Sequence, residues 1–270
     1  MIEPTGTRTR TRALMFIASF AALYGILRLV PIFAWIAGQG RVFTATEFVV
    51  SLYGILLGPY VGSASAIAGT FLGIAFTGRT TFFGLDFIPA AMNALTLGFL
   101  MKRRRVVSVS LFTGMLVLFV FHPYTPKVIS IPNSGIAFPF LWLHLLAYAL
   151  LVSPLSGRAV AWVTGPSTAR MIPALLILSL IGTMAQHLAG NLLFATMATT
   201  VMGLTPNALA FSWQGIFLVY PIERGLIAGV TTIVGAAVIK ALRAAGLTRG
   251  TISQLQHIQG SVARAQRNKG

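Results

Sequence analysis

Residues 52–78 read LYGILLGPYVGSASAIAGTFLGIAFTG. The stretch contains no charged residue, and Gly58-Pro59 divides it, because proline disfavours the helical conformation in the residue before it. Residues 60–78 form an apolar run close to the roughly 20 residues that a helix needs to cross a bilayer. The stretch therefore predicts two membrane helices, about 43–58 and 60–78, with a sharp break between them.

The second of these predicted helices carries a row of small residues along one ridge. The row steps by four, four, three and four residues, through Gly58, Gly62, Ala66, Gly69 and Gly73. Helices in a membrane associate by close packing, so small residues mark contact faces. We expect this ridge to pack within a helix bundle. Two shorter pairs of the same kind are Ala18-xxx-Ala22 and Gly225-xxx-Gly229.

The rest of the chain has a similar composition. It is 56% hydrophobic and 9% charged, whereas a soluble domain carries about 25% charged residues. This predicts an all-α, polytopic transmembrane bundle of about eight helices in residues 1–245, followed by a basic cytoplasmic tail, residues 246–270. Segment 209–218 is too short to cross alone and is expected to be interfacial or re-entrant. The expected spans are about 13–37, 43–58, 60–78, 84–101, 106–122, 136–153, 171–202 and 219–243.

The basic residues set the expected orientation. The net charge is +16, but the Lys and Arg residues stand in short clusters between apolar runs, which argues against nucleic-acid binding. With both termini inside, fifteen of the twenty fall on the inner side and three on the outer side, as the positive-inside rule requires. We therefore expect a multi-pass protein of the cell (plasma) membrane. The tail would either lie on the inner membrane surface or form a docking helix for a cytoplasmic partner.

Polar residues gather at the level of the predicted outer half. Ionisable side chains inside a bilayer are costly and indicate function by default. The chain has four acids, and three of them fall near outer helix ends under this topology. We expect these groups to form an outward-facing pocket for a small-molecule ligand. The candidate substrate-binding residues are Arg28, Glu47, Asp86, Asn93, His187, Asn191, Trp213 and Glu223.

Each acid also has a local explanation. Thr44-x-x-Glu47 before an apolar run has the pattern of a capping box, and Asp86 could cap the helix that follows it. Glu223 follows Pro221, as in the first turn of a helix. Arg28 should pair either with an acid or with a ligand. The His187 and Asn191 pair would serve the site or an interhelical hydrogen bond, while the isolated His122 and His144 are expected to be structural.

No enzyme motif accompanies these residues. The chain contains no cysteine, no HExxH zinc motif and no phosphate-binding GxxxxGK[ST] loop. We therefore expect no catalytic residue, no metal site and no cofactor. We also expect that transport by this chain would need an ATPase supplied by another protein.

Three segments resemble a transporter family. Residues 52–78, residues 83–105 (FGLDFIPAAMNALTLGFLMKRRR) and residues 220–242 (YPIERGLIAGVTTIVGAAVIKAL) are similar to helices of the substrate-binding S-components of energy-coupling factor (ECF) transporters. Ala18-xxx-Ala22 falls where that family has an AxxxA patch that contacts the transmembrane coupling subunit. The resemblance covers a third to a half of the chain.

The resemblance implies a membrane subunit that captures a vitamin-like micronutrient on the outside and works with a coupling subunit and two ATPases. It implies Ala18 and Ala22 as partner contacts. S-components usually have six helices, so this chain would contain a six-helix core and an insertion around residues 123–170. Three other functions remain open: a non-catalytic scaffold or accessory subunit of a membrane complex, a small secondary transporter or channel, and a membrane enzyme.

Overall fold

The computed structural model describes residues 6–34, 42–131 and 135–245. These residues are mainly helical, which confirms the all-α prediction at the level of secondary structure. The predicted tail, residues 246–270, lies outside the described residues. The main helices are α1 (Gly6–Arg28), α3 (Gly58–Thr77), α4 (Phe87–Met101), α5 (Arg105–Phe121), α6 (Trp142–Val152), α7 (Pro154–Thr164), α8 (Thr168–Thr200) and α9 (Pro206–Ala244).

The expected span 43–58 consists of three short pieces. They are the 3-10 helix η1 (Ala45–Phe48), α2 (Val50–Leu52) and the π-helix η2 (Tyr53–Leu57). The structure also contains two antiparallel hairpins that the sequence did not predict. In the first hairpin β1 (Pro31–Ala34) pairs with β2 (Val42–Thr44), and in the second β3 (Val128–Ser130) pairs with β4 (Ala137–Pro139).

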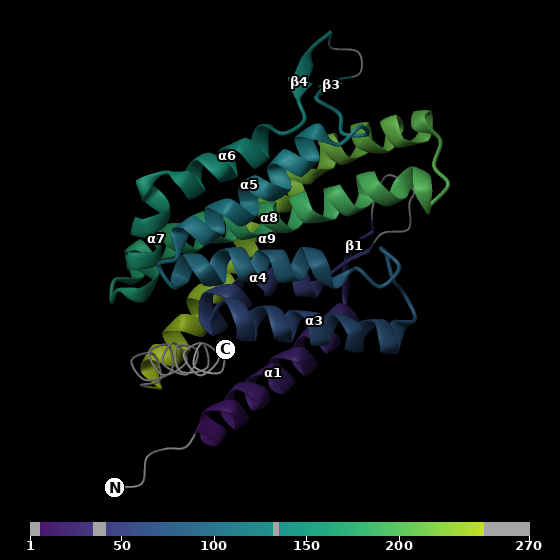
Figure 1. Cartoon of the computed structure of the whole chain (residues 1–270). Helices are drawn as coiled ribbons and strands as arrows, with labels where there is room; N and C mark the ends of the chain where they lie inside the picture. The colour runs from purple at the N-terminus through teal and green to yellow at the C-terminus, as the bar shows by residue number, and fades with distance from the viewer. Residues whose placement is uncertain (1–5, 35–41, 132–134, 246–270) are drawn as a thin grey trace, which may run out of the picture.

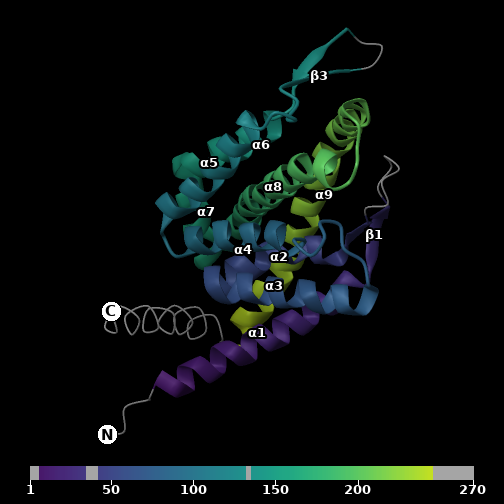
Figure 2. The ribbon, with the colours of Figure 1, turned by 45° about the vertical axis from the view of Figure 1, so that its right-hand side comes forward.

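The helices pack side by side in one bundle (Figures 1 and 2). Neighbouring pairs are α1 with α3, α3 with α4, α4 with α8, and α8 with α9, while α5, α6 and α7 cover another side of α8. The start of α1, the α4–α5 turn, α7 and the end of α9 lie at one end of the bundle. The two hairpins and the α3–α4 turn lie at the opposite end (Figure 1). The bundle therefore has two chemically different ends, because the α4–α5 turn carries the basic run 102–105.

The chain reverses direction at Gly58, which has a φ of 77°. After the turn, α3 lies so close to η2 that a Cβ on Gly62 would stand 2.5 Å from the Tyr53 carbonyl oxygen. Further along α3, a Cβ on Gly69 would stand 2.5 Å from the Cβ of Tyr24 in α1. The ridge of small residues thus packs against two neighbouring segments of the bundle.

Three helical runs of the described residues are long and apolar enough to cross a membrane: Val50–Thr77, α8 and α9. The first run has 28 residues, but its straight part after the Gly58 turn is α3, whose 20 residues reach about 30 Å. Helices α6 and α7 meet at an angle of 70° and together could supply a fourth span. Shorter apolar helices are Ala13–Arg28, Phe87–Met101 and Arg105–Phe121.

Three further expectations about element bounds are wrong. The span expected at 136–153 begins with β4 and is helical only from Trp142. The first span was expected to reach residue 37, but α1 ends at Arg28 and the chain continues into β1. Segment 209–218 is not a separate interfacial piece, because α9 runs without interruption from Pro206 through Pro221. The packing of α9 along α8 maintains the helix across this proline, which costs an isolated helix about 3 kcal/mol.

Candidate functional site

A cavity of about 620 Å³ opens at the end of the bundle that carries the hairpins. Its wall combines the end of α1, the first residues of β1, η1, the α3–α4 turn, the first turn of α4, and faces of α8 and α9. Such a volume is typical of small-molecule sites, which bury most of a ligand. The lining residues are Tyr24, Arg28, Leu29, Pro31, Thr44, Thr46, Glu47, Thr77, Gly78, Arg79, Thr80, Thr81, Phe82, Asp86, Pro89, Ala90, Gln186, His187, Gly190, Asn191, Ile216 and Arg224.

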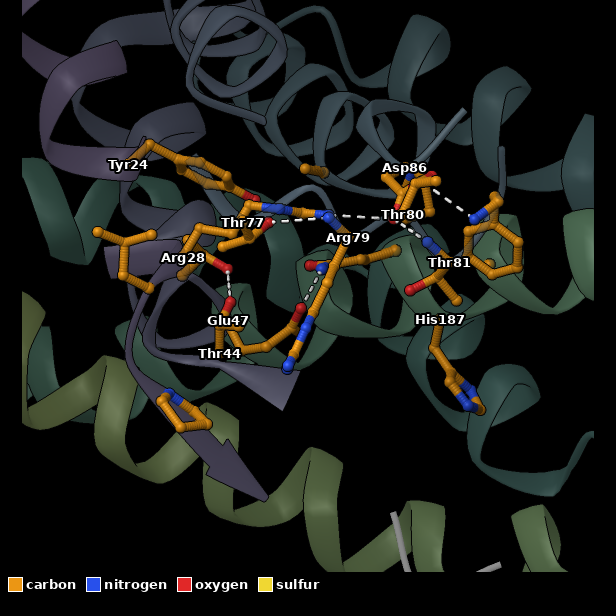
Figure 3. A pocket seen from close by; sticks show the side chains of 18 of the residues that line it. Tyr24, Arg28, Thr44, Glu47, Thr77, Arg79, Thr80, Thr81, Asp86 and His187 are labelled. Atoms are coloured by element: carbon orange, nitrogen blue, oxygen red, sulfur yellow. Dashed lines mark hydrogen bonds and ion pairs between the residues drawn. The ribbon is translucent and has the colours of Figure 1, made fainter. Parts of the chain in front are cut away.

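One side of the cavity is closed by an ion pair between Arg28 and Asp86 (Figure 3). The Arg28 Nη2 atom lies 3.1 Å from Asp86 Oδ1, and both side chains are largely buried. Arg28 is the last residue of α1 and Asp86 immediately precedes α4. The close approach of α1 to α3 brings them together, since the Arg28 side chain lies against Gly73, where a larger residue would collide with it. Arg28 thus has the acidic partner that its position in the sequence required.

Asp86 also organises the α3–α4 turn. Its carboxylate accepts a hydrogen bond from the Thr80 hydroxyl and others from the backbone N–H groups of Thr81, at 2.8 Å, and Phe82, at 3.0 Å. Burial of the carboxyl raises its pKa, but these hydrogen bonds and Arg28 outweigh burial and hold the pKa below the ordinary value of 3.8. Asp86 was expected to cap α4, but its side chain makes no cap hydrogen bond to that helix.

A second ion pair also lines the cavity. Arg224 Nη1 of α9 lies 3.3 Å from Glu47 Oε2 of η1 and also donates to the Thr183 hydroxyl. The other carboxylate oxygen, Glu47 Oε1, accepts a hydrogen bond of 2.9 Å from Gln186 Nε2 of α8. The capping box expected at Thr44-x-x-Glu47 does not form, because the Thr44 side chain makes no cap hydrogen bond and contacts the Thr46 hydroxyl at 2.7 Å.

Asn93 supports this part of the wall from behind and does not line the cavity. Its amide donates to Gln186 Oε1 at 2.9 Å and to the Ser51 hydroxyl at 3.1 Å. Asn93 is fully buried, so these bonds satisfy groups that have no access to water. The chain Ser51, Asn93, Gln186, Glu47 and Arg224 therefore joins α2, α4, α8, η1 and α9 in one hydrogen-bond network.

His187 and Asn191 line the cavity from one face of α8, one turn apart. The Asn191 Nδ2 atom lies 3.4 Å from His187 Nδ1, and the same nitrogen lies 3.1 Å from His144 Nε2 of α6. The His187 ring stacks on Tyr220 with centroids 4.9 Å apart. His144 was expected to be structural, and it is fully buried. The sequence did not indicate its contact with His187, which arises because α6 packs against α8.

Two candidate residues on α9 lie away from the cavity lining. The Trp213 indole N–H donates to the Tyr124 carbonyl at 2.9 Å, within a cluster of buried aromatic side chains. Glu223 is buried beside Arg224, at 3.9 Å, and its Oε2 atom has no hydrogen-bond partner among the described residues. It does not stand in a first helical turn, because α9 begins at Pro206.

Arg79, Gln186 and Arg224 line the cavity although they were not among the candidate residues. Arg224 could have been identified from the sequence, because a charged residue inside an apolar span must find a partner and so indicates a candidate site. The polar Gln186, next to His187, gave a similar indication. Five threonines also line the cavity, and nothing in their local sequence distinguishes them from other threonines: Thr44, Thr46, Thr77, Thr80 and Thr81.

The expected partner contacts, Ala18 and Ala22, lie on an exposed face of α1. Met15 and Ile26 are exposed on the same helix, by 64% and 58%. This face is on the side of α1 that is not packed against α3.

Among the described residues, no group of three or more His, Cys, Asp or Glu side chains is placed to hold a metal ion. The cavity is lined by guanidinium, carboxylate, hydroxyl, amide and imidazole groups, which bind polar ligands by hydrogen bonds and charge. Comparisons with protein-family models, curated proteins and solved structures gave no match.

Proposed function

We propose that this chain is a multi-pass membrane subunit that binds a small, vitamin-like solute for uptake and depends on separate coupling and ATPase subunits. The observation that carries the proposal is the polar cavity, whose wall combines residues from α1, η1, the α3–α4 turn, α8 and α9. Polar side chains from segments far apart in sequence converge on one cavity of ligand size, which is the usual arrangement of a small-molecule site.

The orientation belongs to the same proposal. The basic end of the bundle would face the cytoplasm, in accordance with the positive-inside rule, and the cavity would then open to the outside. Both chain ends would be cytoplasmic, since α1 begins and α9 ends at the basic end (Figure 1). The resemblance of residues 52–78, 83–105 and 220–242 to ECF S-components fits this scheme. In it, the exposed Ala18 and Ala22 face would contact the coupling subunit.

The decisive experiment is to identify a small molecule that co-purifies with the chain. We expect mass spectrometry of the denatured, detergent-purified protein to reveal one dominant solute. Asn191→Leu should reduce its amount, because this nearly isosteric change removes a polar group that lines the cavity. Asn207→Leu is the matched control, since Asn207 is exposed on the first turn of α9 and does not line the cavity.

Both variants should keep the thermal stability of the parent protein within a few degrees, so that loss of solute is not loss of folding. The proposal fails if no solute co-purifies and the parent protein binds nothing from a panel of vitamins and nucleobases. Equal retention of the solute by both variants would place its binding site elsewhere.

The exposed apolar face around Ala18 and Ala22 favours a second candidate, a scaffold or accessory subunit of a membrane complex. In that case the polar cavity would be structural. Stable co-purification with other membrane proteins, in the absence of any bound solute, would support this alternative.

A further inference from the structure

The two acids that line the cavity, Glu47 and Asp86, are already bound to groups of the protein. Of the other two acids in the chain, Glu3 lies outside the described residues and Glu223 lies beside Arg224, away from the lining. Both Asp86 oxygens accept hydrogen bonds, and each Glu47 oxygen has a donor. A cationic ligand would have to displace Arg28 or Arg224 from these carboxylates. The cavity is therefore poorly suited to a cation.

The two buried arginines are matched by acids in the same way. Arg28 pairs with Asp86. Arg224 lies between Glu47, at 3.3 Å, and Glu223, at 3.9 Å. Glu223 does not line the cavity, so the buried charged residues that do line it are two arginines and two acids. This part of the lining offers no surplus of either sign to a ligand.

Arg79 is the exception among the lining residues. It is exposed at the cavity, and no described carboxylate forms an ion pair with it. Its position is set by the α3–α4 turn: Gly78 ends α3 with a φ of 63°, and the Arg79 N–H donates to the Thr77 hydroxyl oxygen at 3.2 Å. Asp86 braces the same turn from the other side. A guanidinium held on a braced turn binds an oxyanion well, because it presents two parallel N–H donors.

We propose that the ligand of this cavity is a soluble small molecule with an acidic group, a carboxylate or a phosphate, and that Arg79 binds this group at the cavity mouth. The inference rests on the proposed function and specifies its substrate class. The apolar body of the ligand would lie toward Tyr24, Phe82 and Ile216, which line the same cavity.

The test uses benzoate and phenyl phosphate as acidic probes and benzamide as their neutral counterpart. We expect the two acids, at equal ionic strength, to raise the melting temperature of the full-length chain in neutral detergent, and benzamide to have little effect. Arg79→Ala should lower the affinity for the two acids about tenfold, and so reduce the rise in melting temperature that they cause, because the charge-assisted hydrogen bonds are lost. Arg79→Lys should retain part of this affinity. Arg158→Ala is the matched control, since Arg158 is an exposed arginine on α7 that does not line the cavity.

The proposal is overturned if benzamide stabilises the protein as well as benzoate does, if no acidic probe stabilises it, or if Arg79→Ala responds like the parent protein. A co-purified solute that is neutral or cationic would overturn it as well, yet would leave the uptake function standing. Repeating the measurement in phosphatidylcholine discs with and without phosphatidylglycerol separates the sources of the acidic group. If benzoate stabilises the protein in phosphatidylcholine discs but not in discs that also contain phosphatidylglycerol, the acidic group belongs to a lipid. A soluble ligand is then excluded.

Discussion

Asp86 has both carboxylate oxygens occupied by donors from Arg28, Thr80, Thr81 and Phe82. In Asp86→Asn the amide nitrogen would face N–H or O–H donors and could accept from none of them. We expect the variant to lose on the order of 1–3 kcal/mol of stability, the usual cost of leaving buried groups unsatisfied. Thermal unfolding of the detergent-purified protein at neutral pH measures this loss.

The loss should depend on pH. Because the pKa of Asp86 in the folded protein lies below 3.8, its charge stabilises the fold fully above about pH 5, and this stabilisation disappears as the pH falls through the folded pKa. The difference in melting temperature between the parent and Asp86→Asn should therefore be constant between about pH 5 and pH 7 and shrink in stronger acid. A difference that grows with acidification would contradict the assignment.

Glu47 shows that a local sequence pattern does not identify the partner of a charged residue. Thr44-x-x-Glu47 has the form of a capping box, yet the Glu47 carboxylate binds Gln186 and Arg224, which are 139 and 177 residues away in sequence. The sequence could flag Glu47, Arg28 and Asp86, because charge is rare in this chain. It could not pair them, because the partners are chosen by helix packing and not by spacing.

At the scale of elements, the contact between α1 and α3 depends on Gly69. A Cβ at this position would stand 2.5 Å from Tyr24 Cβ and 2.7 Å from the Ala21 carbonyl oxygen. Both are part of α1 and cannot move away without displacing that helix. We expect Gly69→Ala to destabilise the bundle by roughly 1–3 kcal/mol, as overpacking in cores does, and to disturb the Arg28–Asp86 pair at the end of α1.

Gly229→Ala is the matched control in α9. Nothing lies within 4 Å of a Cβ built on Gly229, so alanine should be neutral or should add up to about 1 kcal/mol through its higher helix propensity. Thermal unfolding of both variants distinguishes the two positions. If Gly69→Ala is as stable as the parent, close packing of α1 on α3 does not hold this part of the fold.

The sequence predicted the helices better than their ends, because packing against neighbouring helices decides where a helix begins and ends. Residues 209–218 were too short to form a span alone, and Pro221 has the signature of a helix start. In the structure α9 continues through both, over 39 residues, because its buried side packs along α8. Conversely, the apolar run predicted to reach residue 37 stops being helical at Arg28. Apolar composition indicates burial, but it does not show where the backbone turns.

At the scale of the whole molecule, the distribution of charge and the fold agree. The cavity and the three described acids lie toward one end of the bundle, while the basic run 102–105 and the end of α9 lie at the other (Figure 1). The sequence predicts this segregation, because fifteen of the twenty Lys and Arg residues fall on one expected side and three of the four acids fall near helix ends on the other. It did not indicate the hairpins, whose short strands have no distinctive pattern.

The proposed orientation can be tested directly because the chain contains no cysteine. Ile136, at the hairpin end, is 55% exposed, and Ala245, at the end of α9, is also exposed. In intact cells, a membrane-impermeant maleimide should label Ile136→Cys and leave Ala245→Cys unlabelled, because the basic end is retained in the cytoplasm. Permeabilised cells provide the control, since both cysteines should then react. Labelling of Ala245→Cys alone in intact cells would show that the bundle has the inverted orientation. The cavity would then open toward the cytoplasm, which is incompatible with capture of a solute from outside.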